Sequence, residues 1–123
     1  MLTGEKAVAG NTLDNLPVGP VLRQALEAVR ARIAAEFCVD RIVLFGSVVR
    51  GTADAESDVD LLIVLEDHPD YRVRNRIAGL IFDVNLDYDT NLSALVVDRR
   101  AWEEGLFSVL PIHAFIEREG ISL

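Results

Sequence analysis

Two short apolar runs, each bounded by polar residues, place the strongest constraint on the fold of this chain. Ile42–Phe45 is rich in β-forming residues and stops at Gly46, and a second apolar run extends over Val59–Leu65. Runs of this length are typical of buried strands. The intervening segment, Ser47–Ser57, is polar and contains several small residues. The sequence therefore predicts two core strands joined by a polar loop.

Two longer segments carry the hydrophobic repeat of an amphipathic helix. The first follows Pro20, and the second covers residues 70 to about 88. Apolar residues recur there every three or four positions, which places them on one face of a helix. They are Leu22, Leu26, Val29, Ile33 and Phe37 in the first segment, and Val73, Ile77, Leu80, Ile81 and Val84 in the second.

The C-terminal part adds one strand and two shorter helices. Leu92–Val97 is a third strand candidate, a short helix opens at Asp98, and Pro111 stands in the first turn of a last helix that stops at Gly120. This order predicts a small α/β (α+β) fold, with helices packed on a short mixed sheet. We expect residues 1–17 to form a flexible arm and residues 18–123 to form a single domain.

Charge and cysteine content limit the classes of function. The 123 residues carry a formal net charge of −8, which disfavours general nucleic-acid binding. Cys38 is the only cysteine, and its apolar neighbours favour a buried, inert thiol. No apolar stretch is long enough to span a membrane, and residues 1–10 lack the apolar core of a signal peptide. We expect a cytoplasmic protein with no membrane partner.

An acidic pair opens the second predicted strand. Asp58 and Asp60 are separated by Val59, and residues i and i+2 of a strand point to the same face, so their carboxylates project together. Two adjacent carboxylates repel unless a cation lies between them, and Mg²⁺ prefers such oxygen ligands. Taken alone, the pattern favours the alternative of two solvated acids.

The residues after the first strand suit a phosphate group. Gly46 lets a phosphate approach the backbone without a Cβ in the way, and a helix beginning at Ser47 would present its N–H groups and hydroxyl. The alternative is a plain strand-to-helix turn capped by Ser47. Arg50 could hold a phosphate or pair with a nearby acid, and the two interpretations have equal weight.

The joint spacing of these features resembles the signature of the DNA-polymerase-β-like nucleotidyltransferase superfamily. Gly46–Ser47 is followed by residues 48–57 and then by Asp58–Val59–Asp60. The longer match adds Phe45, Arg50–Gly51 and Ser57, and is similar to the minimal nucleotidyltransferases. Those small proteins are often encoded beside a HEPN-domain partner as toxin–antitoxin pairs.

The resemblance implies a Mg²⁺-dependent nucleotidyltransferase. Its substrate would be ATP or another nucleoside triphosphate, and it would transfer AMP to a hydroxyl of a HEPN-domain partner as the antitoxin of that partner. One or two Mg²⁺ ions would take part, and a homo- or hetero-oligomer would be in keeping with such a small domain. The implied catalytic and metal-binding residues are Asp58 and Asp60, and the implied nucleotide-binding residues are Gly46, Ser47, Arg50 and Ser57.

A third carboxylate on a neighbouring strand usually completes the site in this superfamily. Here the corresponding position holds Ser93, and Asp83, Asp87 and Asp89 precede that strand as candidate substitutes. Two other hypotheses therefore stay open. One is a weakened or inactive antitoxin that neutralises its partner by binding. The other is nucleotide transfer to a small molecule, for which the chain offers little room to build an acceptor pocket.

Overall fold

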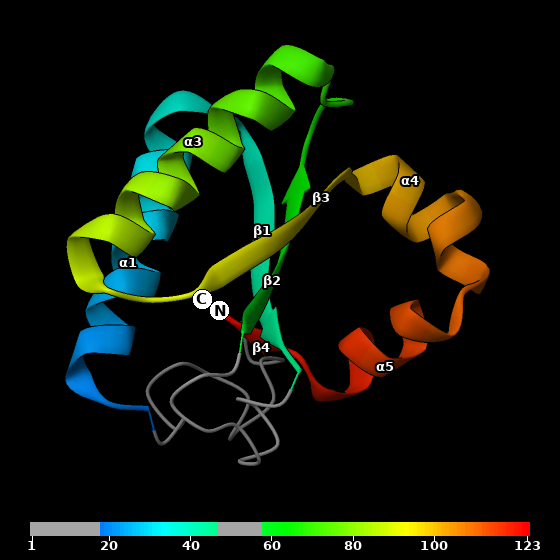
Figure 1. Cartoon of the computed structure of the whole chain (residues 1–123). Helices are drawn as coiled ribbons and strands as arrows, with labels where there is room; N and C mark the ends of the chain where they lie inside the picture. Colours follow the sequence, from blue (N-terminus) through cyan, green and yellow to red (C-terminus); the bar gives the residue numbers. More distant parts are fainter. Residues whose placement is uncertain (1–17, 47–57) are drawn as a thin grey trace, which may run out of the picture.

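A four-stranded sheet lies between two groups of helices in the computed structural model, which describes residues 18–46 and 58–123 (Figure 1). The strand order is β3-β2-β1-β4, with β2 antiparallel to β1 and parallel to β3. The predicted α/β (α+β) class and short mixed sheet are thereby confirmed. The elements are α1 (Pro20–Glu36), β1 (Val39–Phe45), β2 (Val59–Leu65), α3 (Tyr71–Tyr88), β3 (Leu92–Asp98), α4 (Arg99–Glu104), the 3₁₀ helix η3 (Leu106–Val109), α5 (Pro111–Glu119) and β4 (Ile121–Ser122).

The central strand β2 explains why both faces of the sheet are covered. Leu61 and Ile63 pack in the core formed with α1 and α3, whereas Leu62 and Val64 pack in the core formed with α4 and α5. All four side chains have an exposed fraction of 0%. A continuous apolar run is the expected sequence of a strand that is buried on both faces. Figure 1 shows the two helical layers on opposite sides of the sheet.

The two long helices lie where the sequence predicts them, and their end residues follow the usual preferences for helix caps. Pro20 stands in the first turn of α1, where its missing N–H costs nothing. Asp70 caps α3 by accepting a hydrogen bond from the backbone N–H of Val73 at 2.9 Å. The same helix ends at Asp89, which adopts the left-handed conformation with φ 55°.

Three details differ from the sequence-based expectations. Strand β1 begins at Val39, earlier than the predicted Ile42, because its pairing with β2 continues back to Val39 opposite Leu65. Strand β4 and the 3₁₀ helix were not predicted, since β4 has only two residues and is defined by its pairing with β1. The expectation of a buried Cys38 is wrong: the thiol is exposed, because Cys38 lies in the turn before β1 and not within the strand.

Two further sequence-based expectations concern the ends of the chain and membranes. The predicted arm, residues 1–17, lies outside the described residues. Within the described part of the chain, none of the helices combines the length and apolar character that crossing a membrane requires.

Candidate active site

The acidic pair lies at the start of the central strand, on one face of the sheet. Asp60 alternates with the buried Val59 and Leu61, whose side chains pack toward α1 and α3. Asp60 therefore projects from the opposite face, the one that α4 and α5 cover further along β2, and Asp58 lies just before the strand. Asp58 is exposed and Asp60 is half-buried. The shared direction of the two carboxylates stays a prediction from strand geometry.

Each carboxylate is contacted by a neutral side chain from the adjacent strand. The parallel register pairs Asp60 with Ser93 and Val59 with Leu92. The Ser93 hydroxyl lies 3.3 Å from Asp60 Oδ1, and the Asn91 side-chain amide donates to Asp58 Oδ1. Ser93 of β3 therefore contacts Asp60, and Asn91, which precedes β3, contacts Asp58.

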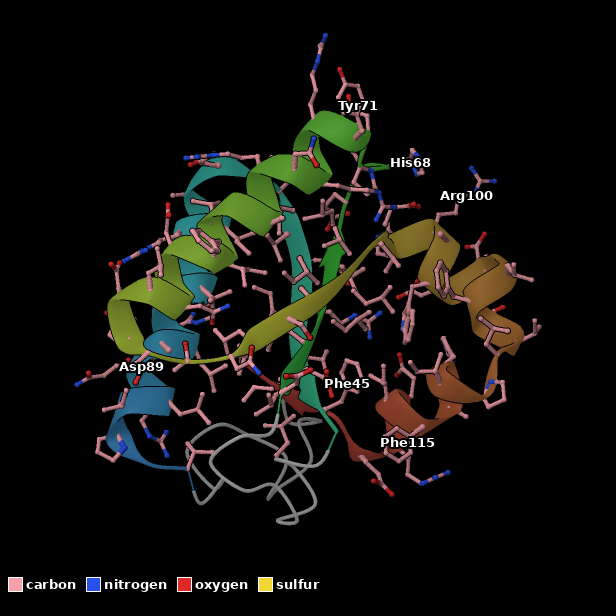
Figure 2. The ribbon with its side chains drawn as sticks, in the orientation of Figure 1. Phe45, His68, Tyr71, Asp89, Arg100 and Phe115 are labelled. Atoms are coloured by element: carbon pink, nitrogen blue, oxygen red, sulfur yellow. The ribbon has the colours of Figure 1, made fainter. Side chains whose placement is uncertain are left out.

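Gly46 closes the other side of Asp60. Phe45, the last residue of β1, pairs with Asp60 across the antiparallel ladder, and Figure 2 shows Phe45 at this end of the sheet. Gly46 follows with a φ of 94°, a conformation that L side chains rarely adopt. A Cβ on Gly46 would lie 2.6 Å from Asp60 Oδ2. The backbone of Gly46 thus lies against a carboxylate oxygen of Asp60.

The structure brings together only part of the predicted set. Gly46, Asp58 and Asp60 lie side by side, whereas Ser47, Arg50 and Ser57 fall outside the described residues. Over residues 18–46 and 58–123, no cationic side chain forms an ion pair with either carboxylate.

The donor set fits a divalent cation. Each carboxylate has one oxygen that accepts a hydrogen bond, and for each the second oxygen, Oδ2, makes no hydrogen bond within the described residues. Two carboxylate oxygens on one face suit a hard cation that completes its shell with water and phosphate oxygens. Asp58 and Asp60 are the residues that would hold such an ion.

The three candidate substitutes for a third acid do not join this pair. Asp87 pairs with Arg32 of α1 at 3.2 Å, and Asp83 lies on the exposed face of α3. Figure 2 shows Asp89 at the end of α3, beside α1. Among the described residues, no three Asp, Glu, His or Cys side chains gather into a group that could hold a metal. Ser93 thus occupies the neighbouring position on β3 without an acidic replacement.

A groove of about 430 Å³ adjoins the site on the outer side of β3. Its helical wall includes Ile77, Ile81 and Phe82 of α3, and Ser93 and Ala94 line its strand side. Phe82 is 60% exposed. Ser93 lines the groove, and its hydroxyl contacts Asp60 on the face of the sheet opposite α3.

Comparisons with known proteins identify the family and agree with the fold. Residues 22–106 match the family described as a nucleotidyltransferase domain, and the chain belongs to that family. A solved structure described as a "putative minimal nucleotidyltransferase" is similar over 83% of this chain and 92% of its own, with a TM-score of 0.59 and 29% identity. Members of the family act on nucleoside triphosphates with a divalent cation.

Two curated relatives come from Methanocaldococcus jannaschii, and each is named "Putative protein adenylyltransferase". Both are 38% identical to this chain, over 58 and 61 residues respectively, which is 47% and 48% of the chain. The matched segments span 59% and 42% of those two proteins. The likeness therefore covers about half of this chain and less than two thirds of the length of either relative.

Asn91 is the site residue that sequence reasoning did not identify. It precedes β3, and its contact with Asp58 depends on the register between β2 and β3. An asparagine before a strand is a common turn residue, so the sequence carries no signal that would distinguish it. Only the parallel pairing reveals its position.

Proposed function

We propose that this protein transfers AMP from ATP to a hydroxyl group of a partner protein, in a reaction that depends on Mg²⁺. The observation that carries the proposal is the pair of carboxylates at the start of β2, with the glycine backbone beside Asp60 Oδ2. The names of the two archaeal relatives support a protein as the acceptor. The protein would act in the cytoplasm.

The reaction forms a bond between the acceptor oxygen and the α-phosphorus of ATP. The bond between that phosphorus and the oxygen bridging to the β-phosphate breaks, pyrophosphate leaves, and the hydroxyl proton is lost to solvent. A bound divalent cation would supply charge stabilisation for the phosphoryl oxygens. Asp58 and Asp60 would hold the cation, and Gly46 would let the phosphates approach the backbone at the end of β1.

The groove beside β3 supports a polypeptide acceptor. It has an apolar wall from α3, and Ser93, which contacts Asp60, is among the residues that line it. An extended segment of a partner protein could lay an apolar side chain against Phe82 and pass the edge strand β3 to bring its hydroxyl to the acidic pair on the other face. A HEPN-domain protein, with this chain as its antitoxin, is the partner that we propose from the sequence resemblance.

Label transfer tests the proposal directly. The protein is incubated with α-³²P-ATP, Mg²⁺ and the product of its neighbouring gene, and labelled protein is detected after gel separation. We expect labelling that falls at least about 100-fold in Asp58→Asn and Asp60→Asn, since each removes a charged metal ligand. Asp67→Asn is the matched control, because Asp67 is an exposed acid outside the site. Equal labelling by all three variants would contradict the proposal.

A second candidate is favoured by Ser93. A hydroxyl stands at the strand position beside Asp60, and no described acid takes the place of a third carboxylate. On this hypothesis the protein binds and neutralises its partner with weak or no catalysis. Ser93→Asp separates the two: a rise in label transfer would show catalysis limited by the missing acid. Neutralisation that survives Asp58→Asn without any labelling would favour binding alone.

A further inference from the structure

The contacts made by Asn91 and Ser93 form a pattern that the proposed reaction does not itself explain. Both side chains come from the start of β3 or the residue before it, and both meet Oδ1 of an acid on β2. Asn91 meets Asp58, and Ser93 meets Asp60, its direct register partner. One oxygen of each acid is engaged, and each donor is uncharged.

Strand pairing determines which side chains meet. Ser93 of β3 contacts Asp60 of β2, and Asn91 contacts Asp58 just before the two strands begin. Parallel pairing then aligns the two pairs across the ladder, from Val59 opposite Leu92 onward. The backbone N–H of Val59 also donates to the carbonyl of Asn91 at 2.9 Å, which secures the first rung.

Neutral donors have a specific effect on a pair of adjacent carboxylates. A hydrogen bond to one oxygen fixes the rotation of the carboxylate and leaves the other oxygen to a ligand. A cationic partner would also fix it but would compete with a metal for the charge. Asp60 shows the outcome clearly, since Oδ1 faces Ser93 and Oδ2 faces the backbone of Gly46.

We propose that Asn91 and Ser93 are positioning residues that orient Asp58 and Asp60 so that Oδ2 of each is held ready for a divalent cation. This inference rests on the proposed function, because it assigns a role toward the metal of that same site. The inference goes beyond the proposed function because it assigns the neighbouring strand β3 a role in metal affinity. Neither residue contacts the substrate in this role.

Metal-dependent nucleotide binding tests the inference without relying on turnover. Binding of a non-hydrolysable ATP analogue to the full chain is measured by calorimetry, once with Mn²⁺ and once with EDTA. We expect Asn91→Ala to weaken binding in Mn²⁺ by about 10- to 100-fold, the range seen when a partner of a metal ligand is removed. Ser93→Ala should weaken it by about 10-fold. Binding in EDTA should stay unchanged in both.

Three control variants separate positioning from general damage. Asn75→Ala and Ser122→Ala make the same chemical changes at exposed positions on α3 and β4, and should leave binding in Mn²⁺ at the wild-type value. Ser93→Thr keeps the hydroxyl and should restore affinity to within about threefold of wild type, since a β-branched residue suits a strand.

The outcomes are distinct. Wild-type affinity for the Mn²⁺ complex in both alanine variants would overturn the inference while leaving the proposed function intact. An equal loss in Mn²⁺ and in EDTA would also overturn it, because a structural role does not depend on the metal. A wild-type protein that binds no nucleotide under either condition would contradict the proposed function itself, and the inference with it.

Discussion

Gly46 and Asp60 approach each other so closely that a Cβ at position 46 would lie 2.6 Å from Asp60 Oδ2. The backbone of Gly46 also has a φ of 94°. Two independent constraints therefore select glycine at this position: backbone strain and the space taken by a carboxylate. The carboxylate oxygen concerned is the one that would meet a metal.

Gly46→Ala should impair both folding and ligand binding. The left-handed backbone conformation costs a non-glycine residue about 1–3 kcal/mol of folding free energy, and the added methyl group displaces the Asp60 carboxylate. Urea unfolding measures the first effect, and binding of an ATP analogue in Mn²⁺ measures the second. Gly79→Ala is the control: Gly79 lies within α3 with open space around its Cα, so it should be neutral or stabilising by up to about 1 kcal/mol.

Asn85 should be important for stability although it lies outside the carboxylate pair. Its side chain donates to the carbonyl of Leu92 at 3.1 Å and accepts from the N–H of Leu92 at 2.8 Å. It also accepts from the Thr90 hydroxyl at 3.0 Å. Asn85→Ala should cost about 3 kcal/mol of unfolding free energy, or about 1 kcal/mol for each hydrogen bond lost.

Urea unfolding of Asn85→Ala beside Asn75→Ala checks this prediction. Asn75 is an exposed residue of the same helix, so its loss should change stability by no more than about 0.5 kcal/mol. Equal stability of the two variants would show that the contacts between α3 and β3 contribute nothing measurable.

Asp98 gives a prediction for pH dependence. The backbone N–H of Ala101 holds the pKa of this carboxyl below its usual range, and a hydrogen bond with His68 lowers the pKa further. A lowered pKa in the folded state means that the stabilisation is complete above the unfolded pKa of about 3.9. It is then lost as the pH falls through the lower folded value.

Asp98→Ala should therefore lower the free energy of unfolding by about 1 kcal/mol at pH 7, the usual cost of losing a helix N-cap. The difference from wild type should shrink as the pH falls below about 4. Denaturant unfolding at pH 7, 4 and 3 measures it. Asp67→Ala, at an exposed loop position, should show no such trend. A difference that grows on acidification would contradict the assigned sign.

Phe82→Asp tests the groove beside β3 as the acceptor surface. Phe82 is 60% exposed on the groove wall, so the change should leave folding and ATP binding intact. Label transfer to the partner should fall by about tenfold. An apolar anchor at an interface commonly contributes about 1–2 kcal/mol of binding free energy, and about 1.4 kcal/mol corresponds to a factor of ten. Leu106→Asp, at a position 76% exposed on the opposite helical layer, should have no effect on transfer.

The sequence was sufficient to predict the elements that have a hydrophobic period of their own. Helices α1 and α3 and strand β2 carry such patterns over their full lengths, and the structure confirms them. The common direction of Asp58 and Asp60 stays a prediction, because Asp58 precedes β2. Strand β4 could not be predicted, because two residues cannot display a period and their strand character comes from pairing with β1.

The contacts between strands could not be predicted from the sequence. Nothing in the order of residues specifies that Asp60 aligns with Ser93, because the register also depends on where α3 ends and how the chain turns at Asp89. For the same reason Asp87 remained a candidate third ligand in the sequence. The structure directs its carboxylate to Arg32 on α1 instead. Long-range pairing therefore decides which polar residues meet the acidic pair.

The site is built across two strands whose amide hydrogens should exchange with solvent at different rates. β2 has a partner strand on each side, whereas β3 has only one strand partner within the described sheet. Edge elements open locally at a lower free energy than the centre of a fold. Asp60 therefore belongs to a strand that is paired on both sides, while Ser93 shares the faster opening of β3. Local opening of β3 should therefore limit how long the carboxylates keep their orientation, because it occurs more often than global unfolding.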